Sequence, residues 1–523
     1  MAGKVYLVGA GPGDPKLITV KGLEVLRKSD AVVYDRLASP RLLEEARPGA
    51  EQYYVGKLPE RHSMTQEEIN GLLVRLAKEG KTVTRLKGGD PCVFGRAGEE
   101  AEALLAHGIP FEIVPGVTSA VAVPAYAGIP VTHREYSSSF TVATGHEKPE
   151  KLDTMIDWRH LSDAGKTIVF LMGVSRIGHI AEQLMSHGRP PDTPVALVRW
   201  GTRAEQETLV GTLATIAEQV READFQPPAV IVVGEVVRLR ERLSWYERLP
   251  LFGRRVLITR ARAQAGELAD RIEALGGEPV EFPVIALKEP DDPEKCAALD
   301  AALDRLDRFD WILFTSVNGV EFFFRRMRRR GVDIRAMHRA TIAAVGPATR
   351  EALMKYGLVV EELPQLYQAE GLLEAIRPKV RPGQTVLLPR ADIARKTLPE
   401  ELRRLGCAVT EVDVYENVPC EDGADRIVEL LNEGAVDAVT FTSSSTARNF
   451  ADIIRRRTDR FAELMAPVRI ACIGPLTAKT AEECGMRADI VPEQATIDAL
   501  AQALAERLGP RPSKYDAPGR RYH

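Results

Sequence analysis

The chain has 523 residues, 45% of them hydrophobic and 28% charged, and a length beyond what one hydrophobic core supports predicts three or four domains. The net charge of −4 gives no support for nucleic-acid binding. No run of about 18 uncharged apolar residues occurs, so the sequence predicts no membrane span. The N-terminus lacks a signal-peptide pattern and the six scattered cysteines form no C-x-x-C pair, which predicts a cytoplasmic protein with reduced thiols and no metal site.

The first predicted strand runs into a glycine-rich turn, "VGAGPGDP", at residues 8–15. A dinucleotide-binding loop needs the pattern G-x-G-x-x-G opening directly into a helix. Gly9 and Gly11 match the first two glycines, but Asp14 stands at the third, and an anionic side chain there disfavours a pyrophosphate. Pro12 and Pro15 also remove two backbone donors. A neutral or cationic nucleoside remains possible.

Short buried strands alternate with helical stretches along the first half and predict α/β layers with mostly parallel sheets. A first lobe over about residues 1–137 contains "KVYLVGAG", "AVVYD", "KTVTRLKGGD" and "FEIVPG". A second lobe over about residues 138–237 contains "SFTVATGH", "TIVFLMG", "PVALVRWG" and "AVIVVGEVV". Ligands of open α/β sheets bind beyond the carboxyl ends of the strands. Those ends carry Asp14, Asp35, Gly88-Gly89-Asp90 and Pro115-Gly116.

A charged stretch with Pro and Gly breaks this pattern at residues 238–255, so we end the first domain at residue 245 and place a linker at 246–253. Residues 254–509 contain an internal repeat with a spacing near 130 residues, which predicts two similar α/β lobes with a ligand cleft between them. The paired segments are "WILFTSVNGVEFFF" with "AVTFTSSSTARNF", "TIAAVGPATREALMKYG" with "RIACIGPLTAKTAEECG", and "VLITRA" with "VLLPRA". The Pro-rich, basic tail 510–523 is predicted to be disordered.

The first 245 residues contain a series of motifs, in this order: "VGAGPGDPKLIT", "VVYDRL", "VGK", "RLKGGDPCVFGRAGEE", "VPGVTSA", "AGIPVTHR", "ATGH" and "LMG". Together these motifs resemble those of the uroporphyrinogen-III C-methyltransferases. The resemblance implies a two-lobed fold that methylates a tetrapyrrole with S-adenosylmethionine, which binds between the lobes. It also implies a homodimer formed through this half.

The resemblance assigns nine residues to the cofactor. They are Pro12, Gly88, Gly89, Asp90, Val93, Thr118, Ser119, Met172 and Gly201. The residues themselves favour such a site, because a Gly-Gly turn lets the backbone approach a ligand and a carboxylate can bind an amino group or a ribose hydroxyl. Two alternatives stay open: Met172 can be a core residue, and Gly201 can be a plain turn glycine.

Asp35 is the candidate general base by the same resemblance, because a proton must leave the methylated ring, and Lys57 is the candidate proton donor. Asp35 can instead cap a helix, and Lys57 can be a solvated side chain or bind a substrate carboxylate. The substrate carries eight carboxylates, which predicts cations around it. The candidates are Arg36, Arg85, Lys87, Arg96, His133 and Arg134.

The duplicated region resembles uroporphyrinogen-III synthase through "VLITRA", "FTSVNGV", "AVGPATREAL", "VYENV", "FTSSSTARNF" and "CIGPLTAKT". That enzyme closes hydroxymethylbilane into a ring with inversion of the last pyrrole, mainly by shaping its substrate. Aligning the repeats places Tyr415 opposite Ile285, so a phenol stands in one copy only and can assist departure of the hydroxyl, although a packed strand tyrosine remains possible.

Hydroxyl side chains of both repeats are candidates for binding substrate carboxylates. They are Thr315, Ser316, Thr349, Ser443, Ser444 and Thr477. Thr349 and Thr477 occupy near-equivalent places in the two repeats and can alternatively be helix caps.

The sequence therefore predicts a bifunctional enzyme of the sirohaem and cobalamin branch that makes uroporphyrinogen III and methylates it twice to precorrin-2. Two alternatives remain. The C-terminal half can be a non-catalytic tetrapyrrole-binding or regulatory module, or the whole chain can bind a nicotinamide cofactor through its glycine-rich turns.

Overall fold

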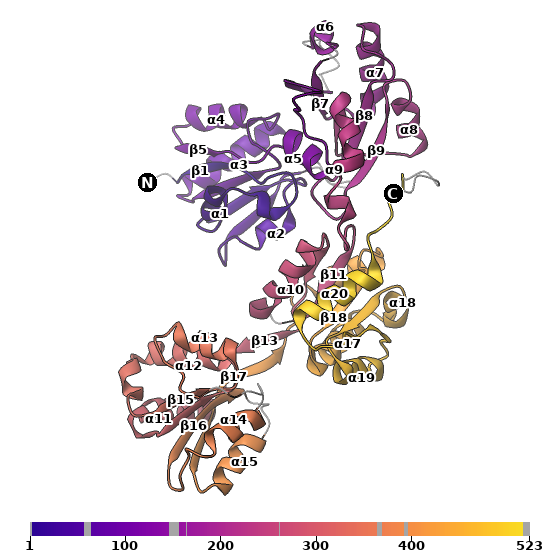
Figure 1. Ribbon diagram of the computed structural model, residues 1–523. Helices are drawn as coiled ribbons and strands as arrows, with labels where there is room; N and C mark the ends of the chain where they lie inside the picture. The colour runs from indigo at the N-terminus through magenta and orange to yellow at the C-terminus, as the bar shows by residue number, and fades with distance from the viewer. Residues whose placement is uncertain are drawn as a thin grey trace. The chain divides into compact units, whose positions relative to one another are not determined.

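The computed structural model describes residues 3–56, 64–145, 156–163, 165–260, 262–362, 364, 369–391 and 396–515 (Figure 1). The chain forms two compact units. The first comprises Met1–Val256, Leu268–Val280 and Thr496–His523, and the second comprises Leu257–Glu267 and Glu281–Ala495. Four five-stranded sheets with helices between their strands confirm the predicted α/β class.

The first sheet has the order β3-β2-β4-β1-β5, and all its pairings are parallel. Its strands are β1 (Val5–Gly9), β2 (Ala31–Tyr34), β3 (Glu51–Tyr54), β4 (Val83–Lys87) and β5 (Phe111–Val114). The intervening helices are η1 (Pro15–Leu17), α1 (Val20–Leu26), α2 (Pro40–Leu43), α3 (Gln66–Lys78), α4 (Ala97–Ala106) and α5 (Ser119–Tyr126). Apolar clusters on both faces bury the central strands, as a parallel sheet requires. Because β1, β2 and β4 are parallel, the loops that follow them lie at one edge of the sheet.

The second sheet has the order β6-β7-β10-β8-β9 and corrects the expectation of mostly parallel strands. Its strands are β6 (Phe140–Thr144), β7 (Thr167–Leu171), β8 (Pro194–Arg199), β9 (Glu207–Thr212) and β10 (Ala229–Val233). Its helices are α6 (Trp158–Leu161), η2 (Val174–Arg176), α7 (Ile177–Ser186) and α8 (Ile216–Glu222). β6 and β7 are parallel, but β10 runs antiparallel to both β7 and β8, and β8 and β9 form an antiparallel hairpin. The short loop between β8 and β9 allows only antiparallel pairing.

The charged segment after β10 forms short helices: η3 (Glu235–Leu239), α9 (Arg240–Leu243) and η4 (Tyr246–Arg248). The ring centroid of Tyr126 lies 5.1 Å from that of Trp245 and 4.9 Å from that of Tyr246. Leu251 and Phe252, in the segment predicted as a linker, are buried. Near the C-terminus Tyr515 packs on Phe225, and the remainder of the predicted disordered tail, residues 516–523, lies outside the described residues. The boundaries of the predicted domains stay predictions.

Two further sheets contain the strands after residue 254. The order β12-β11-β18-β19-β20 joins β11 (Arg255–Ile258), β12 (Glu278–Glu281), β18 (Ala438–Phe441), β19 (Arg469–Cys472) and β20 (Ala488–Ile490). The order β13-β17-β16-β14-β15 joins β13 (Ile285–Lys288), β14 (Trp311–Phe314), β15 (Thr341–Ala344), β16 (Thr385–Ala391) and β17 (Ala408–Pro419). β13 and β17 are antiparallel, whereas β17, β16, β14 and β15 are parallel to one another.

The internal repeat is confirmed as a repeated order of strand and helix. Strand β14 enters helix α12 (Val317–Arg330) and β18 enters α17 (Ser444–Arg457), and in both copies a serine, Ser316 or Ser443, caps the 14-residue helix. Strands β15 and β19 are each followed by a Gly-Pro turn into a helix. The other helices here are α10 (Arg262–Ala274), α11 (Pro293–Leu303), η5 (Leu306–Arg308), η6 (Ile334–Met337), α13 (Pro347–Met354), α14 (Ala369–Ile376), α15 (Thr397–Arg404), α16 (Ala424–Asn432), α18 (Phe461–Met465), α19 (Pro475–Glu483) and α20 (Ile497–Leu508).

No helix among the described residues is both long and apolar enough to cross a membrane. Nor do three or more His, Cys, Asp or Glu side chains gather anywhere in this described part of the chain in a group that could hold a metal ion.

Candidate functional site

A pocket of about 350 Å³ in the first unit is lined by residues of both of its sheets and of the loops after their strands. Seven of the nine residues predicted to bind the cofactor line it. They are Pro12, Gly88, Gly89, Val93, Ser119, Met172 and Gly201. The structure thus brings together segments that lie up to 189 positions apart in the sequence (Pro12 to Gly201).

Glycines let three strand ends meet backbone to backbone beside this pocket. A Cβ added at Gly9 would lie 2.5 Å from the Cα of Gly116, and one added at Gly116 would lie 2.4 Å from the carbonyl oxygen of Gly89. Gly89 also has a left-handed φ of +69°, and Gly11 and Gly89 exchange backbone hydrogen bonds of 3.3 and 2.7 Å. This packing brings the backbones of Gly11 and Gly89, which both line the pocket, into direct contact in its wall.

Asp90 and Thr118, the other two predicted cofactor residues, do not line the pocket. The carboxylate of Asp90 accepts hydrogen bonds from the backbone N–H groups of Cys92 (2.8 Å) and Gly116 (3.0 Å), so it fixes the loop between them. Thr118 caps the N-terminus of α5 through the N–H of Ala120. Both side chains stabilise turns next to the pocket.

The opening loop, residues 8–15, differs from a dinucleotide loop in the element that it enters. This element is the short 3-10 helix η1 rather than a long α-helix, and Asp14 caps that turn through the N–H of Lys16. The other carboxylate oxygen of Asp14 accepts a hydrogen bond of 3.0 Å from the hydroxyl of Tyr126, whose pKa is raised by burial and by this carboxylate. Asp14 is therefore a residue that fixes the loop.

Backbone strain is concentrated at the pocket. Phe94, Arg96, Met172 and Trp200, which line it, have φ values between +46° and +60°, in the left-handed region that side chains disfavour. Each such residue costs on the order of 1–3 kcal/mol and is typical of ligand sites. Met172 is also 54% exposed, so the alternative that it is a core residue is wrong.

Gly201 packs tightly as well as lining the pocket. A Cβ at this position would lie 2.4 Å from a methyl carbon of Val123 in α5. A plain turn glycine would leave room for a side chain, but a side chain at position 201 would clash with Val123. The structure therefore explains on steric grounds why this position is a glycine.

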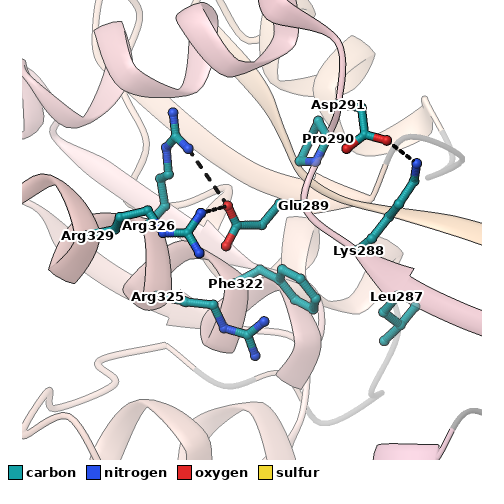
Figure 2. A pocket seen from close by; sticks show the side chains of 9 residues that line it. All are labelled: Leu287, Lys288, Glu289, Pro290, Asp291, Phe322, Arg325, Arg326 and Arg329. Carbon is teal, nitrogen blue, oxygen red and sulfur yellow. Dashed lines mark hydrogen bonds and ion pairs between the residues drawn. The ribbon is translucent and has the colours of Figure 1, made fainter. Parts of the chain in front are cut away.

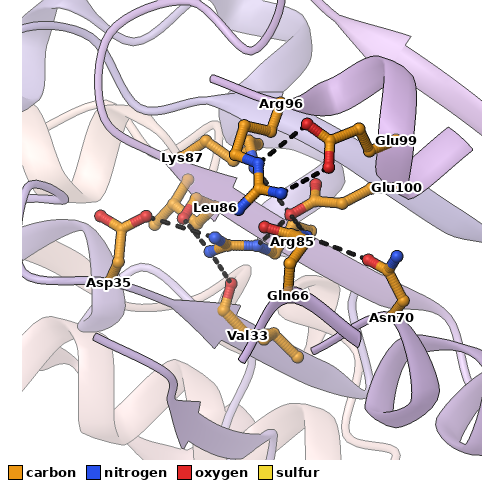
Figure 3. Close-up of polar contacts among 10 residues, drawn as sticks. All are labelled: Val33, Asp35, Gln66, Asn70, Arg85, Leu86, Lys87, Arg96, Glu99 and Glu100. Atoms are coloured by element: carbon orange, nitrogen blue, oxygen red, sulfur yellow. Dashed lines mark hydrogen bonds and ion pairs between the residues drawn. The ribbon is translucent and has the colours of Figure 1, made fainter. Parts of the chain in front are cut away.

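Asp35 lies directly after β2 and lines the pocket, and Figure 3 shows its carboxylate facing Arg85. One of its oxygens accepts a hydrogen bond from the N–H of Leu37 (3.0 Å), and the other lies 3.3 Å from a terminal nitrogen of Arg85. Helix α2 is preceded by Ser39 as its N-cap residue, so Asp35 is not a helix cap. Its side chain is 26% exposed and can meet a ligand.

Glu100 is a buried charge that was not predicted from the sequence. Its side chain is fully buried, and one oxygen accepts hydrogen bonds from Lys87 (2.7 Å), Arg85 (3.2 Å) and Gln66 (3.3 Å), as Figure 3 shows. The other oxygen has no hydrogen-bond partner among the described residues. Burial lowers the pKa of Lys87, and the charge of Arg85 lowers it further. Glu100 therefore holds two cations of the pocket in place.

The remaining predicted cations of this half fall into three groups. Arg85, Lys87 and Arg96 line the pocket, whereas Arg36, His133 and Arg134 do not. Lys57 lies outside the described residues.

Two arginines lie over the ring of Trp200, the residue that follows β8. The guanidinium of Arg36 lies 5.4 Å from the centre of the Trp200 ring, and that of Arg203 lies 5.0 Å from it. Trp200 and Arg203 both line the pocket, although neither was predicted from the sequence, and burial lowers the pKa of Arg203.

Tyr415, the candidate acid of the second half, is in β17 and is only 7% exposed. Its ring stacks on Phe322 with centroids 5.4 Å apart, and its hydroxyl lies 3.4 Å from the Oγ of Ser316. Ser316 also accepts a hydrogen bond from the N–H of Gly319 as the cap of α12. Two of the predicted residues of this lobe are therefore in contact, and Thr315 precedes Ser316 directly.

The other predicted hydroxyls have local partners. Ser443 caps α17, and Ser444 accepts a hydrogen bond of 2.9 Å from Thr480. Thr349 and Thr477 are not helix caps, because Gly346 and Gly474 hold those positions, and each threonine is 6% exposed. Burial leaves these two hydroxyls little surface for a substrate.

Comparison with known proteins gives consistent matches to both halves. Residues 4–217 match the family "Tetrapyrrole (Corrin/Porphyrin) Methylases" and residues 266–502 match "Uroporphyrinogen-III synthase HemD". The chain is 39% identical over 504 residues to "Porphyrin biosynthesis protein HemD" of Ruminiclostridium josui, a match that covers 96% of this chain and 98% of that protein.

Two further relatives match the first half. The uroporphyrinogen-III C-methyltransferase of Priestia megaterium is 57% identical over 235 residues, covering 45% of this chain and 98% of that protein. The crystal structure of uroporphyrin-III C-methyl transferase from Thermus thermophilus, complexed with S-adenyl homocysteine, is 42% identical with a TM-score of 0.39, covering 45% of this chain and 94% of that one.

Proposed function

Since the chain belongs to the family of fusion proteins that join a tetrapyrrole methylase to a uroporphyrinogen-III synthase, we propose that it makes uroporphyrinogen III from hydroxymethylbilane and then methylates it twice to precorrin-2. The observation that carries the methylase assignment is the strained, glycine-lined pocket that contains both Asp35 and buried cations. This product belongs to the sirohaem and cobalamin branch.

The pocket fits S-adenosylmethionine, which supplies an electrophilic methyl group on a sulfonium when bound. The backbone of Gly88, which lines the pocket and is only partly buried, offers hydrogen-bonding groups to the amino acid or adenosine part. Met172, whose side chain is half-exposed, offers a polarisable apolar contact. Asp90 and Thr118 would support this site by fixing the loops around it.

Asp35 is the proposed base that removes the proton from the methylated ring. Its carboxylate is partly exposed in the pocket, and the hydrogen bond from Leu37 and the ion pair with Arg85 hold it in one orientation. Arg85, Lys87, Arg96 and Arg203 line the same pocket and suit the carboxylates of uroporphyrinogen III. Lys57 remains our proposed proton donor, by resemblance.

For the synthase half, we propose that Tyr415 assists departure of the hydroxyl of hydroxymethylbilane. The hydrogen-bond distance between Tyr415 and Ser316 supports this, because the serine can orient the phenol. Thr315, Ser316, Ser443, Ser444 and the backbone near the two Gly-Pro turns are the proposed contacts of the substrate carboxylates. Thr349 and Thr477 stay in this proposal as its two buried members.

Assembly and location follow from the same proposal. We propose a homodimer formed through the methylase half and a cytoplasmic location. The six cysteines are all free thiols, three of them only partly buried and one exposed, which suits a reducing compartment.

A coupled assay tests the proposed function. The purified full-length protein receives hydroxymethylbilane and labelled S-adenosylmethionine, and the product is identified by ring isomer and methyl count. We expect a type III ring with two methyl groups. Formation of the type I isomer alone would exclude the synthase activity and favour a non-catalytic C-terminal half, and an unlabelled type III ring would exclude the methylase activity.

Replacing Tyr415 by phenylalanine should slow ring closure to the type III isomer by about 10- to 100-fold, because the hydroxyl that assists the leaving group is lost. Methyl transfer to supplied uroporphyrinogen III should stay unchanged. Tyr356→Phe is the matched control, because Tyr356 lies in the same lobe and stacks on Phe324 of α12, the helix that also carries Phe322. Wild-type ring closure by Tyr415→Phe would mean that Tyr415 is only a packed strand residue.

A further inference from the structure

A second pocket, of about 620 Å³, lies in the second unit between α12 and the segment that continues β13 (Figure 2). None of the residues predicted from the sequence lines it. Four cationic side chains line it, Lys288, Arg325, Arg326 and Arg329, against two carboxylates, Glu289 and Asp291. The lining therefore has an excess of positive charge, which favours an anionic ligand.

Most of these cations already have carboxylate partners. Glu289 accepts a hydrogen bond of 2.6 Å from Arg329 and lies 3.7 Å from Arg326, which also binds Asp300 through two nitrogens at 2.8 Å. Lys288 pairs with Asp291. These pairs neutralise one another and fix the walls of the pocket.

Arg325 differs, because it forms no ion pair with any residue that the structure describes. Its guanidinium lies 4.6 Å from the centre of the Phe322 ring, and the side chain is exposed. In Figure 2 its guanidinium lies beside Phe322 and points away from the Glu289 cluster. Stacking on the ring orients the guanidinium and leaves its N–H donors available to a carboxylate.

Phe322 connects this arginine to the proposed chemistry of the synthase half. The Phe322 ring is 5% exposed, contacts Arg325, and also stacks on Tyr415, whose hydroxyl is within hydrogen-bond distance of Ser316. Arg325, Phe322 and Tyr415 thus form one continuous stack. A group bound by Arg325 would be held next to the ring that supports Tyr415.

We propose that this pocket is a carboxylate-binding subsite of the synthase half and that Arg325 binds a carboxylate of hydroxymethylbilane there. The inference rests on the proposed synthase function. A planar guanidinium pairs with a carboxylate through two parallel hydrogen bonds, which fixes the orientation of the group that carries it. The subsite would hold one side chain of the linear tetrapyrrole while the ring closes.

Replacing Arg325 by alanine tests the subsite. A lost charge-assisted hydrogen bond of about 1.5–3 kcal/mol corresponds to a rise in the KM for hydroxymethylbilane of about 10- to 100-fold. The kcat of ring closure should change much less, and methyl transfer to supplied uroporphyrinogen III should not change. Arg328→Ala is the matched control, because Arg328 is on the same helix, lies over the Tyr356 ring at 5.8 Å and does not line the pocket.

Two further variants separate charge from packing. Arg325→Lys should recover part of the affinity, and Arg325→Met, which covers Phe322 without a charge, should not. Suppose that the unsubstituted protein closes the ring to the type III isomer. An unchanged KM for hydroxymethylbilane in Arg325→Ala or in Arg325→Met would then contradict the proposed subsite but not the synthase function. Failure of the unsubstituted protein to form the type III isomer would instead overturn the synthase function together with the subsite.

Discussion

Replacing Asp35 by asparagine is expected to slow methyl transfer to uroporphyrinogen III by about 10²- to 10⁴-fold, the usual contribution of a positioned general base. Asparagine has the same shape and can still accept the hydrogen bond from Leu37, so the loop after β2 should keep its conformation. Loss of the charge removes the proton acceptor and the ion pair with Arg85. The measurement is the initial rate of methyl transfer at saturating S-adenosylmethionine.

Asp30→Asn is the matched control. Asp30 precedes β2 at its other end, pairs with Arg47 at 2.7 Å and accepts a hydrogen bond from the N–H of Thr82, but it does not line the pocket. Calorimetric titration with S-adenosylhomocysteine should give similar affinities for both variants and the unsubstituted protein. Equal methyl-transfer rates for the two variants would contradict a catalytic role for Asp35.

Replacing Glu100 by alanine should lower the free energy of unfolding of the first unit by about 3–5 kcal/mol, because removal of one partner leaves other buried charges uncompensated. The side chains of Arg85 and Lys87 are each 5% exposed, and both lie within 3.2 Å of the same Glu100 oxygen. Lys87 in particular already has a lowered pKa through burial, so it would be the first to lose its proton.

Tryptophan fluorescence during urea unfolding can measure this effect. Trp158, Trp200 and Trp245 belong to the first unit, so a Trp311→Phe background makes the signal specific to it. Glu99→Ala is the control, because Glu99 is the preceding residue of α4 but its ion pair with Arg96 is half-exposed. If both variants unfolded at the same urea concentration, the buried network would not be a stabilising feature.

Glycine and apolar patterns in the sequence were enough to predict the strands that build the first pocket. The turns after β1 and β4 were identified because Gly-rich segments follow buried runs. The nine cofactor residues were assigned by the family resemblance, and seven of them line the pocket. The two exceptions, Asp90 and Thr118, have side-chain types that both bind ligands and cap turns. Only the positions of the N–H groups around them, which the sequence does not give, separate these roles.

Other features depend on tertiary structure in ways that a local pattern does not record. Glu99 and Glu100 are identical in type, yet only Glu100 is buried; its spacing from Ala97 and Leu104, both buried on the same face of α4, was the available signal. Trp200 adopts a left-handed φ that no local preference of tryptophan favours. The antiparallel direction of β10 depends on which strands it joins, and a hydrophobic run is the same in either direction.

The antiparallel pairing of β13 with β17 has a consequence for how the second unit folds. In the neighbouring sheet the hydroxyl of Thr440 donates a hydrogen bond to the carbonyl of Leu257, 183 positions away in the sequence. Closing so long a loop costs conformational entropy, which grows by about 0.6 kcal/mol with each doubling of length. Residues 285–419 form a lobe that lies, in the sequence, between Leu257 and Thr440. Because Ile285 at the start of this lobe pairs with Pro419 at its end, the folded lobe shortens the loop between Leu257 and Thr440 about fourfold. Formation of that lobe therefore lowers the entropic cost of completing the enclosing sheet by about 1 kcal/mol, which makes the folding of the two lobes cooperative.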